Sequence, residues 1–136
     1  MKERINEKIK DIEKYLFELE EISSASLKDF KSDLKTKAAC ERYFEKIVES
    51  LVDLVFLIIK HHKFESPNED SEAFVILERH GVIDKLLSEK LQDAKNMRNL
   101  IIHQYEVVDD ERVYEAVKDK LPSDAKEFIK YIKRKI

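Results

Sequence analysis

Apolar residues recur every three or four positions along most of the chain, which is the period of an amphipathic α-helix. The first stripe predicts a helix over residues 5–22 and is formed by Ile5, Ile9, Ile12, Leu16, Leu19 and Ile22. A second series begins at Leu34 and keeps helical spacing to His62, through roughly eight turns of ~3.6 residues. The pattern therefore predicts one long helix preceded by a shorter amphipathic one.

The second half of the long helix is apolar around nearly its whole circumference, from Leu51 to Ile59, with Asp53 as the interruption. A helix that is apolar all round is covered all round, and the other helices of so short a chain are expected to cover about two thirds of it. We therefore expect a second copy of the chain to cover the rest, as a homodimer. This stretch is far shorter than the ~20 residues of a membrane span, so no membrane association is expected.

The second half of the chain predicts three further helical segments. The first begins at Asp70 or Ser71 and is ended by Gly81, the second runs from Ile83 to at least Ile102, and the third follows a cap at Asp109 or Asp110 and is bent or restarted at Pro122. The expected fold is all-α: a single domain over residues 1–136, built as an antiparallel bundle of about five helices.

Composition agrees with a helical domain and excludes several classes of protein. The 136 residues are 43% hydrophobic and 40% charged, with two prolines and Gly81 as the one glycine. Most β-sandwiches and barrels need more glycine and proline for their turns than this chain has. Glycine-rich phosphate-binding loops need several glycines, so they are excluded as well. The single cysteine, Cys40, excludes an intrachain disulfide and a cysteine-based zinc site, and we interpret it as a core residue.

Charge limits how the protein can contact nucleic acid. The net charge of -3 gives no global positive field, so any contact with RNA must be local. The segment Lys118–Lys135 holds seven basic and three acidic residues, and is either a local RNA track or a solvated helix face. The charged N-terminus has no apolar core of a signal peptide, so a cytoplasmic protein is expected.

Three of the four histidines stand at predicted helix ends, at His61, His62 and His80. Neighbours on a helix point about 100° apart, which is unsuitable for binding one metal ion. Favourable interaction with the helix dipole explains these histidines, and no metal or cofactor is predicted.

The segment 97–105 is the chemically distinctive part of the sequence. Arg98, Asn99, His103 and Tyr105 bracket an apolar turn at residues 100–102. On an ideal helix Arg98 and His103 differ by ~140° of rotation and ~7.5 Å of rise, so they do not share a face. Either the helix ends or distorts just before His103, or a dimer axis brings these side chains together from two chains.

Residues 98–105 resemble the R-x4-H-x-Y motif of HEPN-domain proteins, in particular the HepT-like toxins. The order of the surrounding segments is also similar, from about residue 37 to residue 132. The resemblance implies a dimeric, metal-independent endoribonuclease toxin with RNA as its substrate, and a small nucleotidyltransferase antitoxin encoded by a neighbouring gene. It further implies that the antitoxin silences the toxin by attaching AMP to Tyr105.

The residue types suit this chemistry. Cleaving RNA without a metal needs a base for the 2′-hydroxyl proton and an acid for the leaving 5′-oxygen, and a histidine near pKa ~6.5 can serve as either. Arg98 would hold the phosphate and stabilise the developing charge, and Asn99 would support it. Asp53 is a supporting candidate that needs a partner if it is buried, for which we expect Arg98 or Arg42. A partly exposed Asp53 at a dimer seam is the other interpretation.

Two other functions remain open from the sequence. A non-catalytic HEPN module that binds a nucleotidyltransferase or a nucleotide is favoured by the acidic net charge. A plain helical scaffold dimer would explain the apolar segment 51–59, but it leaves the polar residues around the motif without a role.

Overall fold

The computed structural model describes residues 1–23, 25–103 and 109–135, and in these residues it is all-α, as predicted. Its helices are α1 (Lys2–Ile22), α2 (Leu27–Ser32), α3 (Leu34–His62), α4 (Asp70–Arg79), α5 (Lys85–His103), α6 (Asp110–Glu115) and α7 (Leu121–Lys135). A five-residue π-helical segment, η2 (Ala116–Lys120), joins α6 to α7 without a break. With α6, η2 and α7 counted as one continuous segment, the described residues form one helical segment more than the predicted five, and the additional one is the short α2.

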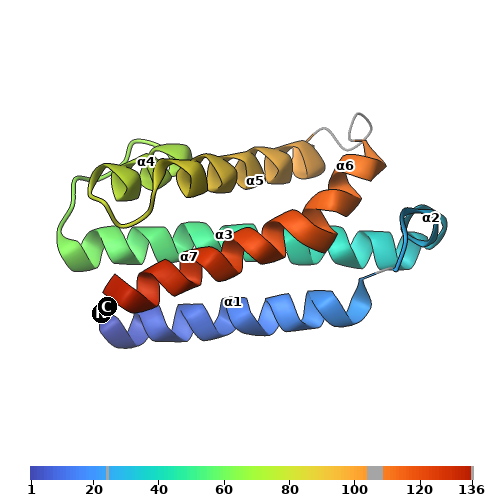
Figure 1. Ribbon diagram of the computed structural model, residues 1–136, viewed down its shortest axis with the longest axis horizontal. Coiled ribbons are helices and arrows are strands. Elements are labelled where there is room, and N and C mark those ends of the chain that lie inside the picture. The colour runs from blue at the N-terminus through green and yellow to red at the C-terminus, as the bar shows by residue number, and fades with distance from the viewer. Residues whose placement is uncertain (24, 104–108, 136) are drawn as a thin grey trace.

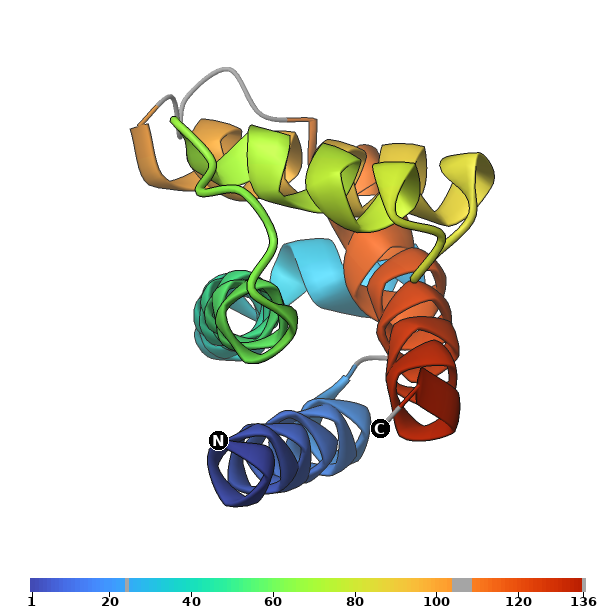
Figure 2. The same ribbon diagram turned by 90° about the vertical axis from the view of Figure 1, so that its left-hand side faces the viewer.

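The long helices α1, α3, α5 and α7 run alongside one another and form the bundle (Figure 1). Seen along its axis, α3 has α1 on one side, α4 and α5 on the other, and α7 beside it (Figure 2). An ion pair of 3.4 Å between Lys133 Nζ and Glu13 Oε2 joins α7 to α1. The hydroxyl of Tyr131 on α7 donates to Asp84 Oδ2, just before α5, at 2.9 Å. The core includes Cys40, which is fully buried, and burial raises the pKa of its thiol to about 11.

The helix ends are set by local side-chain chemistry. Ser26 and Asp33 cap α2 and α3 by accepting hydrogen bonds from backbone N–H groups three residues on, and Asp109 caps α6. Gly81 follows α4 with φ +72°, the left-handed conformation that glycine adopts without strain. The cap at Asp109 and the stop at Gly81 confirm the sequence predictions.

The all-round apolar segment of α3 is covered by the chain itself. Its buried members are Leu51, Val52, Leu54, Val55, Ile58 and Ile59, while Leu57 is half-buried and Phe56 is 37% exposed. The helices α1, α4 and α5 contact α3 and run alongside its second half (Figure 1). The chain thus covers about as much of this segment as the sequence predicts, and a second copy on the remaining surface around Phe56 stays a prediction.

The last helix changes direction just before Pro122, as the predicted bend requires, and it is not interrupted there (Figure 1). Pro122 lies in the first turn of α7, directly after the π-helical segment, where the Leu121 N–H bonds to the Ala116 carbonyl five residues back. A proline clashes with the carbonyl four residues earlier, and the wider π turn removes that constraint within a continuous helix.

Candidate active site

Arg98 lies on α5 and turns toward α3. Its side chain is only 20% exposed, and its Nη2 donates to Glu49 Oε1 on α3 at 3.2 Å. Its Nε is buried without a hydrogen-bond partner among the described residues. The guanidinium is thus held by one carboxylate oxygen and keeps other donors available.

Glu49, and not Asp53, is the carboxylate that meets Arg98. Asp53 is exposed, with 63% of its side chain accessible, and its Oδ2 lies 3.6 Å from Lys8 Nζ on α1. Arg42 pairs with Glu45 on its own helix at 2.9 Å. The expected pairing of Asp53 with Arg98 or Arg42 is therefore wrong by one turn of α3. Which of the two acids, Glu49 or Asp53, contacts Arg98 depends on how α3 and α5 are aligned when they pack. A single sequence does not reveal this alignment.

His103 is the last residue of α5 and is exposed. The helix reaches this residue, so the alternative in which it ends before His103 is wrong. Five residues along a regular helix leave Arg98 and His103 on different faces of α5, about 140° and ~7.5 Å apart. One chain alone does not aim these two side chains at one point.

The other two motif residues have different outcomes. Asn99 is half-buried on α5, next to Arg98. Tyr105, the expected site of AMP attachment, lies outside the described residues.

A cavity of about 880 Å³ lies on another face of α5, against η2 and α7. It is lined by residues that include Asp93, Asn96 and Asp124, but not by Arg98 or His103. Asp124 is nearly buried, and this burial raises the pKa of its carboxyl. The cavity is therefore separate from the motif.

Within residues 1–23, 25–103 and 109–135, no three histidine, cysteine or acidic side chains gather closely enough to hold a metal ion. No helix in the same part of the chain is long and apolar enough to cross a membrane.

The helical bundle is similar in fold to solved toxin structures. The tri-AMPylated HEPN toxin of Shewanella oneidensis, solved in complex with an MNT antitoxin, superposes with a TM-score of 0.88 at 22% identity, covering 96% of each chain.

The family to which the chain belongs is shown by a match along nearly its whole length. The model of the ribonuclease HepT-like family matches residues 5–132, and the chain belongs to this family of ribonucleases. The tRNA nuclease HepT of Aphanizomenon flos-aquae is 24% identical over 113 residues, which are 83% of this chain and 77% of that protein. The mRNA nuclease HepT of Shewanella oneidensis is 24% identical over 104 residues, 76% of this chain and 77% of that protein.

Proposed function

We propose that this chain is the toxin of a toxin–antitoxin pair and cleaves RNA, without a metal ion, at a site that two copies of the chain build together. The observation that carries the proposal is the placement of Arg98 and His103 on two faces of one helix, in a member of a ribonuclease family. The cytoplasm, where RNA is available, is the proposed place of action.

The proposed reaction is an internal transfer at one phosphodiester. One His103 takes the proton of the 2′-hydroxyl, and the 2′-oxygen attacks the phosphorus atom. The bond from phosphorus to the 5′-oxygen breaks, and the second His103 donates a proton to that leaving oxygen. The products are a 2′,3′-cyclic phosphate and a free 5′-hydroxyl.

Arg98 stabilises the negative charge that builds up on the phosphate oxygens. A guanidinium offers five N–H donors, and the contact with Glu49 engages one nitrogen. The Nε is buried, so Nη1 and the second N–H of Nη2 are the donors left to bind phosphate oxygens in the planar geometry that arginine favours. Its contact with Glu49 orients the group before RNA arrives, which lowers the cost of arranging it in the transition state.

A two-fold axis near Arg98 would place each His103 against the Arg98 of the other chain. The exposed Asp53 lies one turn from Glu49 on the same face of α3 and would then face the second copy, in a supporting role together with Asn99. The homodimer is therefore proposed because the site is incomplete in one chain.

We also propose that a nucleotidyltransferase antitoxin silences the chain by attaching AMP to Tyr105. This is supported by the AMPylated HEPN toxin, which forms a complex with its MNT antitoxin. Tyr105 lies two residues beyond His103, so an attached nucleotide would bring bulk and negative charge to the place where the RNA phosphate must enter.

Cleavage in the presence of EDTA tests the activity. The purified chain should cut RNA with chelator present and leave 2′,3′-cyclic phosphate ends, whereas Arg98→Ala and His103→Ala should lose cleavage by at least about 100-fold while staying folded. Arg42→Ala, which removes a 60% exposed arginine of α3, is the matched control and should keep full activity. Activity that vanishes with EDTA, or that survives in His103→Ala, contradicts the proposed mechanism.

Mass spectrometry tests the regulation. The chain coexpressed with a nucleotidyltransferase partner should carry AMP on the peptide that contains Tyr105, and Tyr105→Phe should remove the adduct. An adduct on another residue, or no adduct after coexpression with an active nucleotidyltransferase, overturns this part of the proposal.

A further inference from the structure

A second groove lies at the C-terminal end of α3, between the start of α1 and the loop that follows α3. It has a volume of about 600 Å³, and the described residues that line it include Arg4, Lys60 and Lys63 together with Phe56 and Phe64. No aspartate or glutamate is among these lining residues. A groove with only positive charge is notable in a chain whose net charge is -3.

The three cations of this groove have no ion-pair partner within the described residues. One turn along α1, by contrast, Lys8 is engaged by Asp53. Unpaired cations that line one concave surface focus a positive potential there, even when the whole molecule is acidic. The groove can therefore attract a polyanion locally.

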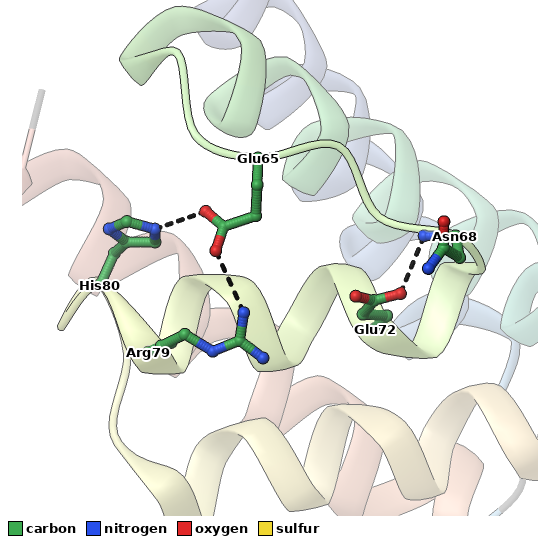
Figure 3. Close-up of polar contacts among 5 residues, drawn as sticks. All are labelled: Glu65, Asn68, Glu72, Arg79 and His80. Atoms are coloured by element: carbon green, nitrogen blue, oxygen red, sulfur yellow. Dashed lines mark hydrogen bonds and ion pairs between the residues drawn. The ribbon is translucent and has the colours of Figure 1, made fainter.

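The loop that forms one wall is held in place by several contacts. The ring of Phe64 stacks on His80, with centroids 3.8 Å apart. Glu65 Oε1 lies 2.6 Å from His80 Nε2, and Glu65 Oε2 accepts from Arg79 at 3.0 Å (Figure 3). At the far end of the loop the Asn68 N–H donates to Glu72 at 2.8 Å. These bonds fix the loop against α4, so the groove is formed before any ligand binds.

Lys63 has an unusual backbone for a residue with a side chain. It ends α3 in the left-handed conformation, with φ 59° and ψ 37°, a position where glycine is usual. This conformation costs a non-glycine residue free energy and is found disproportionately where the side chain has a function. Here it places a cation on the groove.

The groove lies on the same face of α3 as the contact between Glu49 and Arg98. Phe56 and Lys60 follow Glu49 by seven and eleven residues, which returns them to within about 20° of its direction. Lys60 is then ~16 Å from Glu49 along the helix at ~1.5 Å per residue. That distance corresponds to about five stacked nucleotides at ~3.4 Å each, and fewer if the strand is extended.

We propose that this groove binds single-stranded RNA on one side of the cleaved phosphodiester. Arg4, Lys60 and Lys63 bind its phosphates, and the half-exposed ring of Phe56 stacks on a base. The inference rests on the proposed ribonuclease function and deepens it, because it assigns where an acidic protein holds a polyanionic substrate. In the proposed dimer, each copy would contribute one such groove, one on each side of the shared site.

RNA binding by the full-length chain tests the groove independently of cleavage. A His103→Ala background prevents cutting, and a fluorescent RNA of about ten nucleotides serves as the probe. Lys60→Gln with Lys63→Gln should weaken binding about tenfold and reduce the slope of log K against log salt by about 1.4, the release expected for two contacts to a single strand. The matched control is Lys10→Gln with Lys14→Gln, which removes the same charge from a different face of α1 and should change neither quantity.

Phe56→Leu tests the stacking contact. It should weaken binding of an adenine-rich RNA severalfold, since stacking on an aromatic ring is sequence-tolerant and favourable for every base. Phe17→Leu, an aromatic residue 63% exposed on α1, is its control. An unchanged affinity in Phe56→Leu overturns the stacking contact.

Kinetics separate failure of the groove from failure of the proposed activity. With His103 intact, the Lys60/Lys63 variant should raise KM for the ten-nucleotide RNA, leave kcat unchanged, and cut a dinucleotide as well as the natural chain does. Equal KM values for the long RNA, with affinity and salt slope also unchanged, overturn the groove while the activity stands. If the natural chain cuts no RNA, the proposed activity fails, and the binding measurement still decides whether the groove holds RNA.

Discussion

Glu49 accepts a hydrogen bond from Arg98, so a substitution of Glu49 tests whether this contact orients the arginine of the motif. Replacing Glu49 by Gln removes the carboxylate that receives Arg98 Nη2 at 3.2 Å and frees the guanidinium to turn. We expect Glu49→Gln to lower the rate of RNA cleavage about tenfold, because small displacements of a positioned group cost catalysis heavily. Single-turnover cleavage rates at saturating enzyme measure this effect.

Glu45→Gln is the matched control, because it breaks a comparable ion pair one turn earlier on α3, with Arg42. Both pairs are partly exposed, so neither change should alter the free energy of unfolding by more than about 1 kcal/mol. A Glu49→Gln protein that cuts as fast as the natural chain would show that Arg98 needs no such support.

Glu65 links the stability of the loop after α3 to pH. Its hydrogen bond with His80 is the main reason that the pKa of this carboxyl falls from 4.5 to about 2. A group whose pKa is lower in the folded state stabilises the fold above its unfolded pKa, and this stabilisation is lost as pH falls toward the folded pKa. Glu65→Gln should therefore reduce stability at pH 7 and show a smaller loss between pH ~4.5 and ~2 than the natural chain.

Urea unfolding at several pH values measures this difference. Glu89→Gln removes an exposed carboxylate of α5 and should leave the pH dependence of the natural chain unchanged. If Glu65→Gln loses stability on acidification as steeply as the natural chain, the pKa of the Glu65 carboxyl is not lowered in the folded state.

The residues of the motif were predictable, but their partners were not. Arg98 and His103 follow from the R-x4-H-x-Y pattern, which is local in sequence. Glu49 has no such signal, because it stands 49 positions from Arg98 and competes with Asp53 on the same face of α3. Which of the two acids meets Arg98 depends on how α3 and α5 slide past each other, and that is decided by packing.

At the scale of single elements, the end of α3 offers a direct test of strain. Lys63→Gly should raise the free energy of unfolding by about 0.5–1 kcal/mol, because glycine adopts the left-handed conformation without the steric cost that lysine bears. The same change should weaken RNA binding, since it removes one cation of the groove. Urea denaturation and the RNA-binding assay measure the two effects.

Lys60→Gly is the comparison, three residues earlier and inside α3. There glycine only adds freedom to the unfolded chain, so the protein should lose about 1 kcal/mol. A Lys63→Gly protein that is also less stable would show that the lysine side chain contributes more to the fold than its backbone costs.

Helix boundaries followed closely from the sequence wherever capping chemistry was present. The start at Leu34, the stop before Gly81 and the cap at Asp109 lie where the pattern places them. The short helix α2 escaped prediction because its six residues hold fewer than two turns, and helical periodicity needs more than that to be visible. The π-helical segment before Pro122 was not predicted, because it depends on tertiary packing that keeps this helix continuous.

At the scale of the whole molecule, the apolar segment of α3 is covered mainly by the chain's own helices. They bury six of the eight apolar residues at 51–59, close to the two thirds expected from the sequence, and Phe56 stays 37% exposed. The homodimer remains a proposal, and the motif gives a second argument for it, because Arg98 and His103 lie on different faces of α5. The proposed dimer can therefore be tested through catalysis.

Mixed dimers make this dependence measurable. If each site needs one His103 as base and the other as acid, a dimer of one natural chain and one His103→Ala chain lacks one of the two and should cleave RNA at about 1% of the natural rate or less. Two independent sites would instead leave about half of the activity. Differently tagged copies, coexpressed and purified through both tags in turn, provide the mixed species, and a mixed dimer of natural chain and Arg42→Ala chain controls for the tags. Half activity in the His103 mixture would assign a complete site to each chain and remove the catalytic reason for proposing the dimer, while leaving ribonuclease activity itself intact.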